Sequence, residues 1–404
     1  MRKVAVFTGN RAEYGLQFPI LKAIDKHPDL DYQLIVSGAH LDLQFGSTLD
    51  EIKRDGFQIS AEVKLDYNED NNSSTAQAVG VGVLAMIDAL ERLKPDILIV
   101  YADRFEGFAA VIAATQMNIP TAHIEGGDLT EGGALDDSVR HAMSKLSHLH
   151  FTTNEQASNR LLAMGEESWR VKTVGLPSLD MISNEDIADQ QSVADALNID
   201  LARPVVLFTQ HSVTIEFKDA SKQIKPSITA LKRLAEEGVQ VIVTYPNNDA
   251  GGKSIIKEIE ALDKQSLQNI QVHRSLGRYL YHSVLGLAKN PDVNIVCVGN
   301  SSSGLKETPI FGCPTVNVGT RQNGRLRGNN VIDASYSDTE IYTAIQKALS
   351  DEDFRHRCRN TSNPYFIGKA GEAVADVLAK VPLGKEILRK GMTLSGESND
   401  GWYR

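Results

Sequence analysis

The sequence has few cysteines, no long apolar run and no excess of basic residues, and each absence excludes a class of protein. The three cysteines form no C-x-x-C pair, so neither a disulfide framework nor a zinc knuckle is predicted. No segment approaches the ~20 apolar residues that span a bilayer. The chain starts on a strand pattern rather than on an apolar signal segment. We therefore expect a cytoplasmic protein that does not associate with membranes.

The net charge is −10, from 42 basic and 52 acidic residues. Nucleic-acid-binding proteins normally carry a basic face, so nucleic acid is not an expected partner. A few arginines in a cleft can still bind an anionic small molecule. No set of His, Cys, Asp and Glu residues has metal-ligand spacing. We expect neither a metal ion nor a cofactor.

Short β-rich runs alternate with helical patterns along the whole chain. Runs such as 97–100 and 205–208 are apolar on both faces, which is typical of parallel strands covered by helices on both sides. We expect strands at 4–8, 32–37, 96–101, 120–124, 149–153, 171–174, 205–209, 239–245, 270–273, 293–298, 314–318 and 330–333. The predicted fold class is α/β, with two Rossmann-like doubly wound domains that face a cleft.

At 404 residues the chain is long enough for two domains. We expect an N-terminal Rossmann-like domain at 1–176, with the acid–base residues, and a linker at 177–203, which is polar and bounded by prolines. A second Rossmann-like domain, at 204–370, is expected to bind a nucleotide. The remaining 371–404 are expected to form a helix and a polar tail that could pack back on the first domain.

Ligands of open parallel sheets bind at the carboxyl ends of the strands, so polar residues after each strand are candidate site residues. In the first domain these positions hold Arg11, then Asp103 with Arg104, then Glu125 at a double glycine. Each alone also fits a surface turn or a helix cap. The next helix carries Asp136 and Arg140 four residues apart, which also fits an ordinary ion pair.

Three carboxylates at neighbouring strand-to-helix junctions, with arginines between them, indicate an acid–base site. Crowded carboxylates raise one another's pKa values, and nearby arginines keep at least one of them ionised. That combination suits proton abstraction from carbon and proton return to it. The sequence therefore predicts a site of proton transfer in the first domain.

In the second domain, His211 ends a strand, and Asn247 and Lys253 follow another. The segment 298–307 runs from a strand into a Gly/Ser-rich turn at a helix start, where backbone amides and the hydroxyls of Ser301 and Ser302 can bind a phosphate group. Glu307 is placed to accept ribose hydroxyls. Arg321 belongs to a basic, glycine-containing loop that could close on the cleft. Structural roles for the histidine and helix capping by the serines are the alternatives.

A set of motifs, in this order along the chain, carries a family resemblance. They are G-N-R-A-E-Y-G (9–15), A-D-R (102–104), H-I-E-G-G-D (123–128), D-D-S-V-R-H (136–141), Q-H (210–211), G-N-S-S-S-G (299–304) and G-T-R-Q-N-G-R (319–325). Together they resemble the hydrolysing UDP-N-acetylglucosamine 2-epimerases of bacterial sialic-acid and legionaminic-acid pathways, and the epimerase half of the human bifunctional epimerase/kinase. The resemblance covers residues 3–380 and implies a fold of the glycosyltransferase-B type.

The resemblance implies that UDP-N-acetylglucosamine and water give N-acetylmannosamine and UDP through anti elimination to a 2-acetamidoglucal and rehydration. By motif position, Asp103, Glu125 and Asp136 are the expected acid–base carboxylates, oriented by Arg140. The expected catalytic set also includes His211. Expected substrate contacts are Arg11, Gly15, Arg104, Asn247, Lys253, Ser301, Ser302, Glu307 and Arg321. A homodimer or homotetramer is expected, because relatives form them.

Two departures from the family pattern leave other substrates open. Ala102 stands where the family has Gly before Asp-Arg, and an insertion-like 129–134 follows the H-I-E-G-G-D motif. The longer loop could accept a 2,4-diacetamido-2,4,6-trideoxy sugar, linked to UDP or GDP, on a legionaminic-acid route. The non-hydrolysing epimerases typically show H-V-E-A-G-L-R at this motif, which favours the hydrolysing branch. A glycosyltransferase of the same fold is a further alternative.

Overall fold

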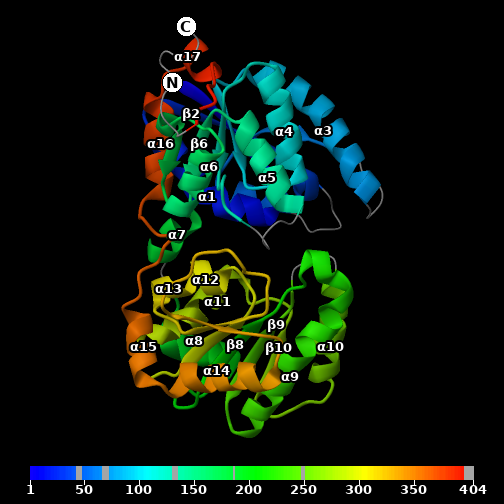
Figure 1. The fold of residues 1–404 in the computed structure, drawn as a ribbon, viewed down its shortest axis with the longest axis vertical. Coiled ribbons are helices and arrows are strands. Elements are labelled where there is room, and N and C mark those ends of the chain that lie inside the picture. Colours follow the sequence, from blue (N-terminus) through cyan, green and yellow to red (C-terminus); the bar gives the residue numbers. More distant parts are fainter. Residues whose placement is uncertain (42–47, 66–71, 130–134, 185–186, 247–250, 395–404) are drawn as a thin grey trace. The chain divides into compact units, whose positions relative to one another are not determined.

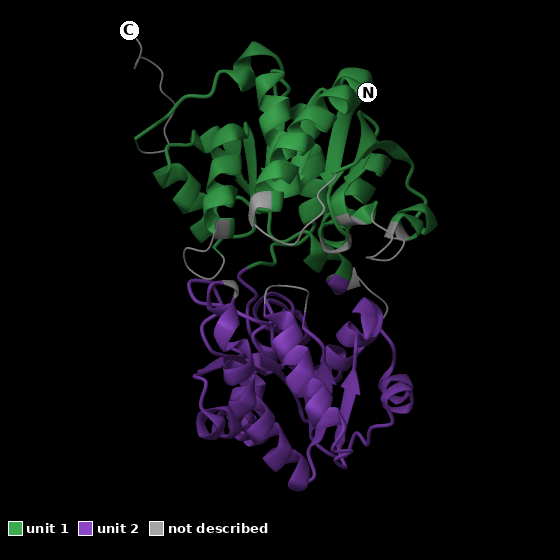
Figure 2. Ribbon diagram, turned by 90° about the vertical axis from the view of Figure 1, so that its right-hand side faces the viewer, with its two compact units in different colours: residues 1–129, 135–181, 365–404 green, residues 130–134, 182–364 purple. Residues whose placement is uncertain are grey.

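The computed structural model describes residues 1–41, 48–65, 72–129, 135–184, 187–246 and 251–394. These residues form two compact units (Figure 2). Unit 1 comprises 1–129, 135–181 and the C-terminal 365–394, and unit 2 comprises residues within 182–364. The segment predicted as a linker, 177–203, contains α7 (Ser178–Asn184) and α8 (Gln190–Leu197). Each unit is built around its own parallel sheet.

The sheet of unit 1 has seven strands in the order β3-β2-β1-β4-β5-β6-β7, and all of its neighbouring pairs are parallel. The strands are β1 (Arg2–Thr8), β2 (Leu30–Ser37), β3 (Ile59–Val63), β4 (Ile97–Tyr101), β5 (Thr121–Ile124), β6 (Leu149–Thr152) and β7 (Val171–Thr173). The strand order reverses between β1 and β4. Ligands of doubly wound sheets bind beside such a reversal, at the carboxyl ends of the strands.

Helices cover both faces of this sheet (Figure 1). They are α1 (Arg11–Lys26), α2 (Thr48–Arg54), α3 (Asn72–Leu93), α4 (Phe105–Gln116), α5 (Leu135–Leu146), α6 (Glu155–Ala163), α16 (Ala370–Lys380) and α17 (Lys385–Leu388). One apolar core joins the sheet to α1 and α16, and another joins its opposite face to α3, α4 and α5. Burial of alternate strand residues on both faces explains the continuous apolar runs of the sequence.

The C-terminal segment is part of unit 1. The α16 helix packs against α1 so closely that a β-carbon on Gly371 would lie 2.5 Å from the carbonyl oxygen of Pro19. The fully buried guanidinium of Arg170 donates to the carbonyl oxygens of Ile387, at 2.8 Å, and Arg389, at 2.7 Å. Hydrogen bonds and helix packing therefore fix residues 370–390 on the first sheet.

The sheet of unit 2 has six strands in the order β10-β9-β8-β11-β12-β13, again parallel. They are β8 (Val205–Thr209), β9 (Gln240–Thr244), β10 (Ile270–His273), β11 (Ile295–Gly299), β12 (Thr315–Val318) and β13 (Val331–Ala334). The helices besides α8 are α9 (Ala220–Glu236), α10 (Gly252–Asp263), α11 (Gly277–Gly286), α12 (Ser303–Lys306), α13 (Thr308–Phe311), α14 (Asp338–Ser350) and α15 (Glu352–Arg359).

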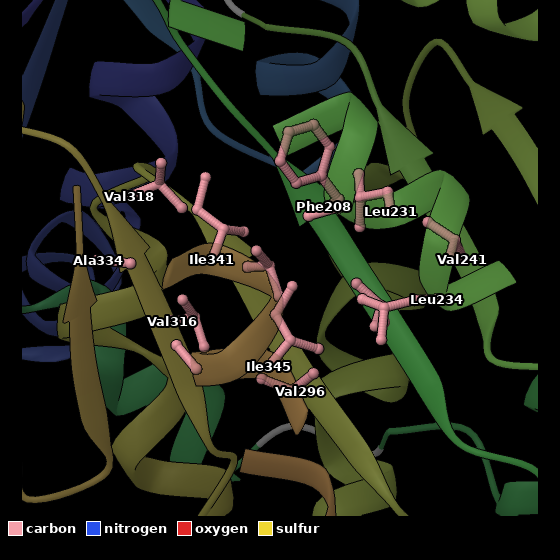
Figure 3. Packing of buried hydrophobic residues seen from close by; sticks show 14 of the residues in the cluster. Phe208, Leu231, Leu234, Val241, Val296, Val316, Val318, Ala334, Ile341 and Ile345 are labelled. Carbon is pink, nitrogen blue, oxygen red and sulfur yellow. The ribbon is translucent and has the colours of Figure 1, made fainter. Parts of the chain in front are cut away.

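The core of unit 2 forms where α9 and α14 pack on the sheet (Figure 3). Leu231 and Leu234 of α9 and Ile341 and Ile345 of α14 point at strand residues such as Val296. All five are at most 2% exposed. The strand order reverses between β8 and β11, so the loops after these strands mark the expected ligand edge.

The predicted fold class is confirmed as two doubly wound parallel α/β domains. The edge strand β3 was not predicted from the sequence. The helix that begins after the serine-rich turn is broken: two short helices, α12 and α13, meet at Glu307. Pro309 explains the break, because it has no amide hydrogen to continue the helical bonding. Among the described helices, none is both long and apolar enough to cross a bilayer.

The contact between α16 and α1 gives a first prediction. Gly371→Ala should lower the free energy of unfolding by about 1–3 kcal/mol, because the added methyl group would meet the backbone at Pro19. The matched control is Gly80→Ala in α3, where a β-carbon meets nothing within 4 Å. It should be neutral or gain up to about 1 kcal/mol. Urea denaturation measures both, and equal effects in the two variants would contradict the packing.

Candidate active site

The carboxyl ends of β1, β4 and β5 lie side by side in unit 1 and carry most of the predicted acid–base residues. Tyr101, the last residue of β4, is paired in register with Ile124, the last residue of β5. Asp103 follows Tyr101 after one intervening residue, Ala102, and Glu125 follows Ile124 directly. The parallel sheet therefore brings the two carboxylates to one edge, as the sequence predicts.

A buried arginine of α5 connects this helix with the turn after β4. Arg140 of α5 is 4% exposed and forms an ion pair with Asp103. Its other terminal nitrogen lies 3.5 Å from Oδ1 of Asp137, one turn earlier in the same helix. The guanidinium thus bridges the side chains of Asp103 and Asp137. The site therefore contains a fixed carboxylate at the tip of β4.

Two residues at this edge have left-handed backbone angles although neither is glycine. Ala102, between β4 and Asp103, has a φ of 52°, and Glu125 has a φ of 63°. The amide of Glu125 donates to the carbonyl oxygen of Phe151 at 2.9 Å. Such conformations cost of order 1–3 kcal/mol and concentrate at functional sites. Here they turn both carboxylates at the strand tips.

Glu125 lies in a largely buried environment. It is 7% exposed, and the hydroxyl of Tyr101 lies close enough to interact with its carboxylate. Burial, together with the negative charges of Glu125 and Asp128, raises the pKa of the Tyr101 hydroxyl above its ordinary value. Tyr101 therefore stays protonated and can donate to a carboxylate. Tyr101 was not predicted as a site residue, because a tyrosine at the end of a strand is usually a core residue.

Asp136 and Asp137 differ in burial. The side chain of Asp136 is exposed, whereas its neighbour Asp137 is 4% exposed and contacts Arg140. Both lie in the first turn of α5, where negative charge is favourable. Asp137 is thus a site residue that the sequence analysis did not select.

Arg104 belongs to unit 1 and binds a neighbouring carboxylate. Its guanidinium donates to both oxygens of Glu106, at 2.9 and 3.1 Å, and the Glu106 side chain is fully buried. Gly15 lies in α1 with open space where a side chain would be. Arg11 begins α1, but its side chain lies outside the described residues.

Glu13 is a further carboxyl group at this edge. Asn10 caps α1 by accepting from the amide of Glu13, and Oε2 of Glu13 accepts from the amide of Gly9 at 2.6 Å. Burial and, to a lesser degree, the nearby Glu106 carboxylate raise the pKa of Glu13 to about 8, although the hydrogen bond from the Gly9 amide opposes the shift. Glu13 is therefore mostly protonated at neutral pH. The pattern Asn10-x-x-Glu13 of a capping box could have drawn attention to it.

In unit 2, the loops after β8 and β11 are tied to each other. The amide of His211 donates to Oδ1 of the fully buried Asn300 at 2.6 Å, and Nδ2 of Asn300 donates back to the carbonyl oxygen of His211 at 2.9 Å. Arg321 also donates to the carbonyl oxygen of Asn300, at 3.2 Å. Asn300 thereby brings His211 and Arg321 to the loop that carries Ser301 and Ser302.

Glu307 faces α11 as well as its own loop. Its Oε2 accepts from the hydroxyl of Ser303 at 2.6 Å and lies 3.3 Å from Nε2 of His282. Burial alone would raise the pKa of Glu307, but these contacts hold it below its ordinary value. Lys253 is exposed in the first turn of α10, and Asn247 lies outside the described residues. Among the described residues, no group of His, Cys, Asp and Glu could hold a metal ion.

The raised pKa of Glu13 predicts how stability depends on pH. Unfolding returns the pKa from about 8 to 4.5, so the stabilisation is fully present below 4.5 and is lost as the pH rises through 8. Between pH 5 and pH 9, the unfolding free energy of the protein should fall by about 1–4 kcal/mol relative to that of Glu13→Gln. Glu91→Gln, at an exposed site in α3, is the control. If the unfolding free energies of the protein and of Glu13→Gln change equally with pH, Glu13 is not buried in its protonated form.

Known proteins resemble this chain over nearly its whole length. The family model described as UDP-N-acetylglucosamine 2-epimerase matches residues 22–379. The UDP-N,N'-diacetylbacillosamine 2-epimerase (hydrolyzing) of Legionella pneumophila is 35% identical over 96% of this chain and 99% of its own. A UDP-N-acetylglucosamine 2-epimerase of Neisseria meningitidis is 33% identical, over 87% of this chain and 88% of its own.

A solved structure supports the fold. The UDP-GlcNAc 2-epimerase of Neisseria meningitidis bound to UDP-GlcNAc aligns with a TM-score of 0.78 at 20% identity, covering 94% of this chain and 100% of that one. At this identity the likeness shows the fold alone. The family model, together with the relatives at 35% and 33% identity, confirms the resemblance read from the motifs. The chain belongs to the UDP-N-acetylglucosamine 2-epimerase family.

Proposed function

We propose that this protein is a hydrolysing 2-epimerase that converts a UDP-linked 2-acetamido sugar and water to UDP and the free sugar inverted at C2. The observation that carries the proposal is the buried Arg140 between Asp103 and Asp137, beside Glu125, in a chain of this family. A glycosyltransferase of the same fold has no need of this carboxylate cluster. In the proposed reaction water is the second reactant, and no sugar acceptor is needed.

The chemistry needs a base and an acid at the sugar. In the first step a carboxylate removes the proton at C2 while the bond from C1 to the UDP oxygen breaks, which leaves a 2-acetamidoglucal. Water then adds at C1, and a proton returns to C2 from the opposite face. Asp103, paired with Arg140, is suited to one of these transfers, and Glu125 beside the protonated Tyr101 is suited to the other. Asp136 remains a proposed third acid–base residue, since its exposed carboxylate can contact a ligand.

Departure of UDP requires stabilisation of the negative charge that develops on its diphosphate. We assign this role to unit 2, where Asn300 gathers His211, Arg321 and the serine-rich turn. Fixed donors of this kind lower a barrier by several kcal/mol in comparable sites. Glu307 is proposed to accept the ribose hydroxyls, with Ser301 and Ser302 on the phosphates. Arg11, Gly15, Arg104, Asn247 and Lys253 remain proposed substrate contacts.

Two sugars are candidates for the substrate. The motifs favour UDP-N-acetylglucosamine, which would give N-acetylmannosamine for sialic-type acid synthesis. A UDP-linked 2,4-diacetamido-2,4,6-trideoxy sugar is the second candidate. It is supported by the diacetylbacillosamine epimerase relative, which matches almost end to end, and by the lengthened 129–134 segment. GDP in place of UDP is an alternative for the second sugar.

A direct assay separates these substrates. The purified protein should release UDP and a C2-inverted free sugar from one of the two UDP-sugars, with water alone and no acceptor. Phosphorus and proton NMR follow both products in one sample. Release of the sugar with its C2 configuration unchanged would mean plain glycosyl hydrolysis. Turnover that depends on an added acceptor would favour a glycosyltransferase.

Asp103 is expected to act on the sugar rather than on the nucleotide. Asp103→Asn should lower kcat by about 10²–10⁴-fold, because the amide cannot exchange a proton as a carboxylate does. The Kd for UDP, measured by calorimetry, should change by less than about threefold, since that site is assigned to unit 2. Asp96→Asn is the matched control, because Asp96 is exposed at the opposite end of β4. A collapse of UDP affinity in Asp103→Asn would contradict the division of roles.

A further inference from the structure

His123 of β5 is completely buried, and both of its ring nitrogens are engaged. Nε2 lies 2.6 Å from the carbonyl oxygen of Ala102, and Nδ1 lies 2.9 Å from the hydroxyl of Ser144. A carbonyl oxygen only accepts, so Nε2 carries the hydrogen and Nδ1 accepts from Ser144. This assigns one neutral tautomer to the ring.

The hydrogen bond from Nε2 of His123 fixes Ala102, the residue with left-handed backbone angles that precedes Asp103. Ala102 has left-handed backbone angles, which an alanine keeps only where its surroundings fix it. Its amide donates to the carbonyl oxygen of Ile124 at 3.0 Å, and its carbonyl oxygen accepts from His123. Both backbone polar groups are thus bound by residues of β5. Asp103 is the next residue, so its position depends on this clamp.

The second bond reaches the helix that carries the arginine. Ser144 is fully buried in α5, one turn after Arg140. His123 therefore connects the turn that carries Asp103 with the helix that carries its ion-pair partner. Gly126 leaves room for this connection, since a β-carbon there would lie 2.9 Å from both Nδ1 of His123 and the hydroxyl of Ser144.

We propose that His123 is a positioning residue for the reaction: it sets the geometry of the Asp103–Arg140 pair without contacting substrate. The inference rests on the proposed function, because it assumes that Asp103 exchanges a proton with the sugar. His123 is not itself the base, since both nitrogens are used within the protein. Burial also lowers the pKa of His123 to about 3, which keeps the ring neutral.

Substitution of His123 by Gln or by Asn tests its two hydrogen bonds one at a time. The side-chain nitrogen of Gln can occupy the place of Nε2 and keep the bond to Ala102, whereas Asn reaches only as far as Nδ1 and keeps the bond to Ser144. His123→Asn should lower kcat by about 10–100-fold, because small displacements at a reacting group are costly, while KM and the Kd for UDP stay within about threefold. His123→Gln should lose less than about tenfold.

His148 supplies the matched control. It is also a buried histidine of unit 1, and its Nδ1 accepts from the amide of Thr121 at 3.1 Å, at the opposite end of β5. His148→Asn should lower the melting temperature about as much as His123→Asn but leave kcat within about threefold, because no reacting group lies at that end of the sheet. An equal loss of kcat in both Asn variants would reduce the role of His123 to general stability, and wild-type kcat in His123→Asn would overturn the proposal outright.

A second measurement tests the proposal without turnover. Nitrogen-15 NMR of the imidazoles should show His123 as the neutral Nε2–H tautomer throughout pH 5–8, which follows from the two bonds. Exchange of the buried Arg140 guanidinium hydrogens with solvent should speed up by about tenfold or more in His123→Asn, and not in His148→Asn. Unchanged exchange in His123→Asn would refute the positioning role. A wild-type protein that shows these signatures and epimerises neither sugar would instead refute the proposed function alone.

Discussion

A buried guanidinium between two carboxylates is the interaction on which the candidate active site of unit 1 depends. The charged side chain of Arg140 can be buried only because Asp103 and Asp137 lie against it. Leaving such a charge without its partner costs about 3–5 kcal/mol, so the β4 turn and the start of α5 are held in one arrangement. The same contact fixes the Asp103 side chain at the place where we propose that a sugar proton is exchanged. The Asp103–Arg140 ion pair thus stabilises the fold and also positions a residue of the proposed reaction.

The arrangement reaches far along the chain, because α5 is fixed at two places. From the middle of α5, Arg140 binds the turn after β4, and at the end of the helix Lys390 donates to the carbonyl oxygens of Ser144, Lys145 and Ser147. These are the carbonyl groups that a helix leaves unpaired at its C-terminus, and a cation satisfies them well. Burial lowers the pKa of Lys390 to about 8, although Glu166 beside it favours the charged form. The C-terminal segment therefore belongs to the active unit.

Much of this could be predicted from the sequence. Strands that are apolar on both faces, followed by polar residues, identified the parallel sheets and placed Asp103, Glu125 and Arg140 at one edge. The sequence could not choose between Asp136 and Asp137, because i,i+3 and i,i+4 neighbours both lie near Arg140 and only tertiary burial separates them. Glu13 and His123 were missed for a related reason. The sequence does not show whether the side chain of a glutamate or a histidine is exposed or is buried against hydrogen-bond partners.

The most direct test of the account is the reaction in D₂O with the UDP-sugar that the protein turns over. Removal and return of the C2 proton predict that the released sugar is inverted at C2 and carries deuterium there, seen as loss of the C2 proton signal. Asp103→Asn should release this product at least about 100-fold more slowly under the same conditions. Inverted sugar that keeps its original C2 hydrogen would contradict proton exchange at the carboxylate edge, and with it the central role given to the Asp103–Arg140 pair.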